Sequence, residues 1–109
     1  MDACQVTVTA GSHDEAVLVA DSLLDARLAA CVQIIGPIES RYWWRGQREV
    51  ASEWLCLVKT RTALLDGVVA AVRAVHSYDT PEVVALPIVG GDPEYLAWLE
   101  DEASGGRDP

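Results

Sequence analysis

The run from Trp54 to Val58 (WLCLV) constrains the fold more than any other stretch of this chain. It is apolar at every position and lies in a segment, from about Glu49 to Lys59, that we predict to be a strand. Side chains alternate between the two faces of a strand, so a continuous apolar run predicts that both faces are covered. Helices on one side of a sheet cover only one face. The run therefore predicts either a third layer or self-association, and we favour self-association.

Hydrophobic periodicity and capping signals divide the chain of 109 residues into strands and helices. Ser12 and Glu15 have the spacing of a capping box, Gly36-Pro37 bends or bulges a strand, and Gly46 centres a hairpin turn. The predicted elements are a strand at residues 3–10, a helix from Ser12 to about Leu28, strands Cys31–Trp44 and Glu49–Lys59, a helix capped by Thr60 or Thr62 with His76 in its last turn, a strand Pro81–Val89, and a short helix opened by Asp92-Pro93.

This order of elements, with the helices on one side, predicts an α+β fold of the ferredoxin-like split β-α-β type, βαββαβ followed by a short C-terminal helix. We expect a single domain over residues 1–102, because the chain is long enough for one core and too short for two. Residues 103–109 are polar and contain glycine, and we predict that this tail is disordered.

The formal net charge of −9 predicts that the protein binds neither nucleic acid nor anionic membranes. Cationic ligands, divalent metal ions included, are not repelled. Cys4, Cys31 and Cys56 form no Cys-x-x-Cys pair, and each lies in an apolar context. Free cysteines of this kind fit a reducing compartment, and the sequence indicates neither a signal peptide nor a membrane span. We therefore predict a cytoplasmic location.

The segment from His76 to Glu82 (HSYDTPE) carries the densest side-chain chemistry in the chain. Pro81 disfavours a helical conformation at Thr80, so the chain leaves the preceding helix extended. An imidazole, a phenol and two carboxylates lie within these seven positions and can bind a ligand. The alternative is a polar turn in which His76 stabilises the C-terminus of the helix.

Aromatic side chains crowd the predicted hairpin. They are Tyr42, Trp43, Trp44 and Trp54. Because aromatic residues are enriched at protein interfaces, this crowding also favours self-association. Ordinary core packing is the alternative.

A set of runs extends over roughly residues 5 to 100. They are DARLAACV at 25–32, YWWRG at 42–46, Ser52-Glu53, Lys59-Thr60, HSYDTPE at 76–82, ALPI at 85–88 and YLAW at 95–98. In order and spacing they resemble the CutA divalent-cation tolerance proteins. The resemblance implies a homotrimer of ferredoxin-like subunits, similar in fold and assembly to the PII signalling proteins, whose long hairpin strands pair across subunits.

The resemblance also implies a role in tolerance of copper and other divalent cations, with copper(II) binding. Family members with a proposed copper site have Cys at the end of the first strand and His before the Tyr-x-x-Pro-Glu run. Ala10, Val75 and His76 occupy those positions here. Copper(II) prefers several nitrogen or oxygen donors, so the metal site predicted from this chain consists of His76 with the carboxylates of Asp79 and Glu82.

A second group of side chains lies in the matching runs and forms a candidate cleft between subunits: Tyr42, Trp44, Glu53, Lys59, Tyr78 and Glu82. Lys59, the only lysine, can anchor an anionic ligand there. It can equally form an ion pair with Glu53 or Glu82 at an interface, because a buried charge needs a partner. The alternative function is therefore a PII-like regulatory or scaffold trimer that binds a small molecule or a protein in these clefts.

No catalytic constellation is predicted. An acylphosphatase-type hydrolase on this fold needs a phosphate-binding glycine loop with a nearby arginine, whereas residues 10–14 (AGSHD) are acidic and contain none. His13 and His76 have no evident paired nucleophile. We expect a protein that is not an enzyme.

Overall fold

The computed structural model describes residues 2–106 of the chain. Its elements are β1 (Ala3–Ala10), α1 (His13–Asp25), β2 (Cys31–Trp44), β3 (Gln47–Arg61), a 3₁₀ turn (Thr62–Leu64), α2 (Leu65–Val75), β4 (Val83–Ile88) and α3 (Pro93–Glu102). The strands form one sheet in the order β2-β3-β1-β4, and every neighbouring pair is antiparallel. Two interleaved β-α-β units produce this order, so the predicted α+β ferredoxin-like fold is confirmed.

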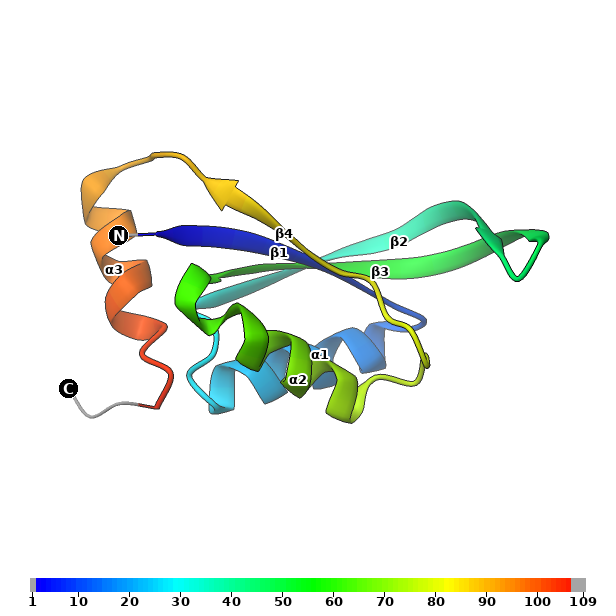
Figure 1. Cartoon of the computed structure of the whole chain (residues 1–109), viewed down its shortest axis with the longest axis horizontal. Coiled ribbons are helices and arrows are strands. Elements are labelled where there is room, and N and C mark those ends of the chain that lie inside the picture. The colour runs from blue at the N-terminus through cyan, green and yellow to red at the C-terminus, as the bar shows by residue number, and fades with distance from the viewer. Residues whose placement is uncertain (1, 107–109) are drawn as a thin grey trace.

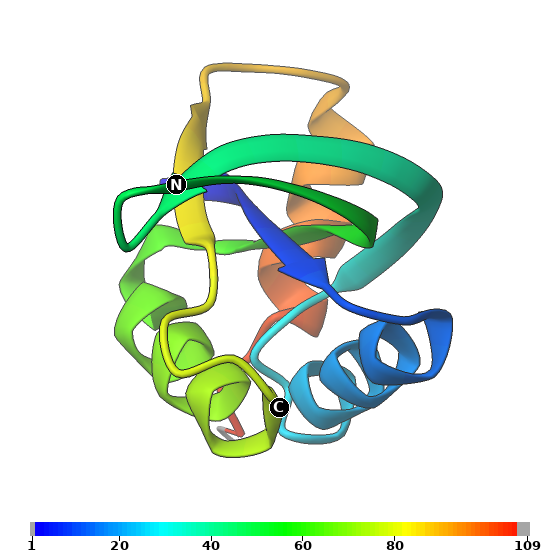
Figure 2. The same ribbon diagram turned by 90° about the vertical axis from the view of Figure 1, so that its right-hand side faces the viewer.

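Helices α1 and α2 lie side by side against one face of the sheet (Figure 1; Figure 2). Helix α3 lies across one end of the sheet, and the β2–β3 hairpin projects from the opposite end, beyond the helices (Figure 1). Within residues 2–106, no helix combines the length and the apolar character needed to cross a membrane. The molecule therefore has a packed body and a long two-stranded arm.

The core lies between the two helices and the face of the sheet that they cover. Alternate residues of the two central strands point into it, because side chains along a strand alternate between its faces. The fully buried members are Val6 and Val8 of β1, Cys56 and Val58 of β3, Val19 and Leu23 of α1, and Val68 and Val72 of α2. Full burial of such a side chain stabilises the fold by about 1.5–3 kcal/mol.

The opposite side of the sheet, which we call the open face, is not covered by α1 or α2. Along β3 it carries Glu53, Leu55, Leu57 and Lys59, and the pairing register adds their cross-strand neighbours. Three large apolar side chains on this face stay strongly exposed, at 49%, 52% and 56%: Ile35, opposite Leu55, and Val84 and Leu86, which pair with β1. The described chain supplies no third layer. The prediction that both faces of the run from Trp54 to Val58 are covered is therefore not fulfilled within one copy.

The predicted hairpin turn is confirmed. Strand β2 has the predicted bounds, whereas β3 extends two residues beyond the predicted Glu49–Lys59 at each end. Arg45 and Gly46 form a two-residue connection with φ of 51° and 78°. Two positive φ values are the signature of the primed turn whose twist matches that of paired strands. Near the tip, Arg45 and Arg48 stack over the rings of Trp44 and Trp43.

The predicted irregularity at Gly36-Pro37 is also confirmed. The β2–β3 register shifts between Ile35 and Ile38, which marks a bulge. A Cβ atom at Gly36 would lie 2.4 Å from the ring of Trp54. Glycine is therefore required here because the indole packs directly onto the backbone of β2.

Several predicted helix boundaries need correction. Thr60 and Thr62 do not cap α2: Thr60 is buried at the end of β3, where its hydroxyl donates to the Leu28 carbonyl, and Thr62 begins the 3₁₀ turn. The capping prediction failed because the strand runs through this position. The first helix ends at Asp25, and Arg27 then adopts a φ of 58°, which reverses the chain before Leu28.

The remaining boundaries are closer. Helix α2 ends at Val75, so His76 is its extended C-cap residue and not part of its last turn. Strand β4 covers Val83–Ile88, because the segment ahead of it stays irregular after Pro81. Asp92 caps α3 as predicted, accepting a hydrogen bond from the backbone of Tyr95.

Packing continues past the predicted domain boundary at residue 102. Ala103 is fully buried, and its carbonyl accepts a hydrogen bond from Nε of Arg61. The backbone N–H of Gly105 donates to the carbonyl of Arg27. The first part of the tail predicted at 103–109 is thus tied to the body, while residues 107–109 lie outside the described part of the chain.

Candidate functional site

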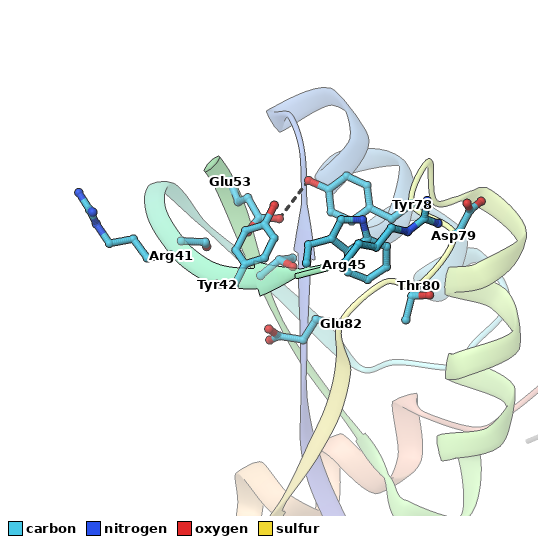
Figure 3. Close-up of a pocket in the computed structure, with 11 residues that line it drawn as sticks. Arg41, Tyr42, Arg45, Glu53, Tyr78, Asp79, Thr80 and Glu82 are labelled. Carbon is cyan, nitrogen blue, oxygen red and sulfur yellow. Dashed lines mark hydrogen bonds between the residues drawn. The ribbon is translucent and has the colours of Figure 1, made fainter. Parts of the chain in front are cut away.

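A cavity of about 730 Å³ lies where the base of the β2–β3 hairpin meets the segment after α2 (Figure 3). We call it the hairpin pocket. Its lining residues are Thr9, Ser40, Arg41, Tyr42, Trp44, Arg45, Glu53, Tyr78, Asp79, Thr80 and Glu82. Five members of the predicted cleft group therefore share one cavity: Tyr42, Trp44, Glu53, Tyr78 and Glu82. Lys59, the sixth, does not line it.

Glu53 and Tyr78 form the central contact of the hairpin pocket. The Tyr78 hydroxyl donates to Oε2 of Glu53 at 3.0 Å, and the two side chains approach from different parts of the chain (Figure 3). Glu53 is only 5% exposed. Burial raises the pKa of Tyr78 to about 12, together with the hydrogen bond to Glu53 and the charge of that carboxylate. Tyr78 is thus a fixed neutral donor at neutral pH.

The imidazole of His76 holds Tyr78 in place. Its Nδ1 accepts a hydrogen bond from the backbone N–H of Tyr78 at 3.0 Å, so Nε2 carries the proton and donates to the Thr9 carbonyl at 2.6 Å. The His76 side chain is fully buried. Both ring nitrogens are therefore occupied, and the histidine ties the segment after α2 to the end of β1.

Glu15 and Gly11 complete this junction. Glu15 caps the start of α1 by accepting from the Gly11 backbone, and Nε2 of His76 lies 3.6 Å from its carboxylate. Burial acts to raise the pKa of Glu15, but hydrogen bonds from Ser77 and Gly11 and the nearby His76 lower it overall. A Cβ at Gly11 would lie 3.2 Å from the Tyr78 hydroxyl, so a small residue lets the phenol reach Glu53.

The metal site predicted from His76, Asp79 and Glu82 does not form within one copy. Asp79 and Glu82 line the hairpin pocket, but His76 offers it no free nitrogen. Over residues 2–106, no group of three or more His, Cys, Asp and Glu side chains is arranged to hold a metal ion. His13 is engaged elsewhere, in an edge contact with the ring of Trp54. The donors of a single chain therefore do not fit copper(II), which prefers several N or O ligands.

Lys59 lies far from Glu53, one of the two carboxylates with which it could form an ion pair at an interface. It lies six positions after Glu53 on the same strand, a span of about 20 Å. Its Nζ donates instead to Oε1 of Gln33 on the neighbouring strand. An ion pair between Lys59 and Glu53 is therefore impossible within one copy.

The pocket also contains residues that the sequence did not single out: Thr9, Ser40, Arg41, Arg45 and Thr80. Two of them follow from strand register. Thr9 is paired with Leu55, and Ser40 lies between Ile38 and Tyr42, which face Glu53 and Glu49 across the hairpin. Arg41 is bound to Glu39 at 2.8 Å and points away from the Glu53–Tyr78 pair (Figure 3).

Comparison with known proteins places this architecture in a family. Residues 4–102 match the model of the CutA1 divalent ion tolerance protein family. "Protein CutA 1, chloroplastic" of Oryza sativa is 46% identical over 96 residues, which cover 88% of this chain and 54% of that protein. The chain thus spans about half the length of this plant relative.

The prediction of a cytoplasmic location is contradicted by the relatives. The rice protein is named chloroplastic, and the solved structure of CutA from Archaeoglobus fulgidus is described as that of a periplasmic divalent cation tolerance protein. Proteins of this family are therefore named for other compartments, and the fold of the domain does not determine where the protein is located.

The solved structures agree with the fold over nearly its whole length. CutA1 from Oryza sativa superposes with a TM-score of 0.91 at 43% identity, covering 94% of both chains. The Archaeoglobus fulgidus protein superposes with a TM-score of 0.89 at 42% identity, covering 93% of this chain and 98% of that one. This chain belongs to the CutA1 divalent ion tolerance protein family.

Proposed function

We propose that this protein acts in divalent-cation tolerance as a homotrimer, and that its metal-binding donors come together only in the assembly. The observation that carries the proposal is the open face. It presents the exposed side chains Ile35, Val84 and Leu86 beside the half-buried Leu55 and Leu57. Monomeric proteins rarely expose contiguous apolar surface of this kind, and a further copy is a fitting cover for it.

The strand order supports assembly as well. Strands β2 and β4 are the two edges of the sheet, so each leaves backbone N–H and C=O groups unpaired within the described chain. The outer part of β2 pairs only with β3 along the projecting arm. Pairing of an arm with the sheet of another copy satisfies these groups and buries Trp43, which is 70% exposed.

The carboxylates of the hairpin pocket are the metal donors that we propose. Asp79 and Glu82 supply oxygen atoms, the ligand type taken by many divalent cations. The net charge of −9 favours the approach of cations. Two carboxylates from one copy fall short of a full ligand set, which is why the assembly is part of the proposal. The proposed ligand is copper(II) or another divalent cation. In this proposal His76 has a structural role and is not a metal ligand.

The proposed role is not enzymatic. The hairpin pocket contains no nucleophile paired with a free base, since His76 has both ring nitrogens engaged and Tyr78 stays neutral. The comparisons do not favour the alternative of a PII-like regulatory or scaffold trimer.

Native mass spectrometry of the protein with and without copper(II) tests the proposal. We expect a trimer that takes up metal in multiples of three. Asp79→Asn combined with Glu82→Gln should abolish specific uptake. The matched control, Asp66→Asn with Glu94→Gln, changes the charge equally at two exposed helix positions away from the pocket and should leave uptake intact. A monomer would overturn the assembly, and a trimer without specific uptake of copper(II) or another divalent cation would overturn the metal assignment.

A further inference from the structure

We propose that the hairpin pocket is completed by Lys59 of a second copy, whose ammonium group pairs with the buried carboxylate of Glu53. This inference rests on the self-association proposed above and names the contact that closes the pocket. The two charges lie on the same face of β3, with Leu55 and Leu57 between them. They cannot meet in one chain, but two copies can bring them together.

Glu53 lacks a compensating charge in its own chain. It is 5% exposed, and its described hydrogen-bond partner is the neutral hydroxyl of Tyr78. The ion pairs formed within residues 2–106 are Arg27–Glu102, Arg41–Glu39 and the contact of His76 with Glu15, so none involves Glu53. A carboxylate removed from water is stabilised by a cation and by hydrogen bonds from several donors. The phenol supplies a hydrogen bond but no compensating charge.

Lys59 is the complementary case. Its ammonium group has a neutral amide partner, the side chain of Gln33, and no carboxylate partner among the described ion pairs. It is half-buried at the body end of the open face. A cation held at the edge of an apolar surface is placed to meet an anion on whatever covers that surface.

The arginines are less suited to this role. Within the described chain, four are held by a partner and a fifth donates to a backbone carbonyl: Arg27 to Glu102, Arg41 to Glu39, Arg45 over Trp44, Arg48 over Trp43, and Arg61 to Ala103. Arg73 lies on α2, on the other side of the sheet from Glu53. Lys59 is thus the described cation that is both on the open face and without a charged or aromatic partner.

The apolar side chains between the two charges fix how the copies meet. Leu55 and Leu57 separate Glu53 from Lys59 by about 20 Å along the strand. When the open face of one copy covers that of another, the leucines lose water on both sides. The charges at the two ends then specify register, because a shifted arrangement would leave a carboxylate and an ammonium group buried without partners.

Charge exchange tests this contact. We expect Glu53→Lys and Lys59→Glu each to raise the dissociation constant of the assembly at least about tenfold, the range measured for close charge pairs. The double variant carries both charges in exchanged positions and should recover most of the loss. Sedimentation velocity over a dilution series gives the dissociation constants, and circular dichroism reports folding of each variant. A double variant no better than the weaker single variant overturns the contact.

A milder pair keeps the test decisive if a reversed charge prevents folding. Glu53→Gln and Lys59→Met remove the charges without reversal, and their effects on the dissociation constant should be non-additive, since each breaks the same pair. Additive effects overturn the contact. Wild-type protein that stays monomeric overturns self-association itself. If the protein assembles but substitution of either residue leaves the dissociation constant unchanged, only the Glu53–Lys59 contact is overturned.

A free organic amine is the other source of an ammonium group, and n-butylammonium distinguishes it. This cation should raise the melting temperature of the Lys59→Met variant, where the pocket lacks its ammonium group, and leave wild-type protein unchanged. Equal stabilisation of both proteins would mean that the pocket is open to free amines in the assembly, and it would overturn the assignment to Lys59.

Discussion

The two faces of β3 are built from neighbouring residues but find their partners in different places. Trp54, Cys56 and Val58 point toward α1 and α2, which belong to the same chain. Leu55 and Leu57 point the other way, where the described chain covers them only in part. The difference shows that an apolar strand face predicts burial but does not identify the part of the molecule, or the other copy, that covers it. One face explains the fold of a single copy, and the other carries the self-association that we propose.

The largest expected effect lies on the covered face. Leu23→Ala leaves a cavity in the core and should destabilise the protein by about 2–5 kcal/mol, irrespective of protein concentration. Leu57→Ala is the matched change on the open face, and its effect should grow with protein concentration, because the leucine is fully enclosed only in the assembly. Urea denaturation at two concentrations separates the two behaviours. A concentration-independent loss for Leu57→Ala would break the comparison.

The next effect concerns the close approach of β2 to β3. Gly36→Ala places a Cβ 2.4 Å from the ring of Trp54 and should destabilise the protein by about 1–3 kcal/mol through overpacking. The tryptophan emission should shift as the indole moves. Gly90→Ala is the control, since nothing lies within 4 Å of a Cβ there. Equal stability of the two variants would contradict the packing described.

A smaller effect depends on pH and concerns the hairpin pocket. The pKa of Tyr78 is raised to about 12 from its usual value near 10, so the folded protein retains a proton that the unfolded chain loses. The stability contributed by this group is present below pH 10 and is lost as the pH rises from 10 toward 12. Tyr78→Phe should flatten the fall in melting temperature over this window. An unchanged slope would remove Tyr78 from the alkaline transition.

The smallest effect separates the cysteines and leaves stability unchanged. Burial raises the pKa of the Cys56 thiol to about 11 and also raises that of Cys4, so both should resist a thiol reagent at pH 8 until the protein unfolds. Cys31, at the start of β2, is partly exposed and should react first. Reaction kinetics with a chromogenic disulfide check this order, and rapid modification of Cys56 in the folded protein would contradict it.

The covered face could be predicted from the sequence because its signals are local. Alternation in β1, the turn at Gly46 and the cap at Asp92 each depend on a few neighbouring residues, and the structure has all three. Long-range contacts were harder. Thr60 has the chemistry of a helix cap, but its hydroxyl is taken by Leu28, 32 positions away. His76 likewise has the chemistry of a ligand, and Thr9 occupies one of its nitrogens.

The residues of the candidate site could also be predicted in part. Tyr42, Trp44, Glu53 and Tyr78 were grouped from matching runs, and the structure gathers them in one pocket. Lys59 was grouped with them, and the length of β3 separates it from them. The strand predicted from about Glu49 to Lys59 already implied this separation, because six residues of extended strand span about 20 Å.

The bulge in β2 sets the parity of the arm. Before it, the odd-numbered Gln33 and Ile35 share the open face with Leu57 and Leu55, and after it the even-numbered Ile38 pairs with Glu53. The extra residue thus moves the alternation of the whole outer strand by one step, which is how Tyr42 comes to line the pocket with Glu53. If the same sequence continued past Ile35 without the bulge, Ile38 would lie opposite Ser52 and Tyr42 opposite Arg48, on the other side of the arm. Tyr42 therefore lines the pocket because β2 contains one residue more than the facing stretch of β3.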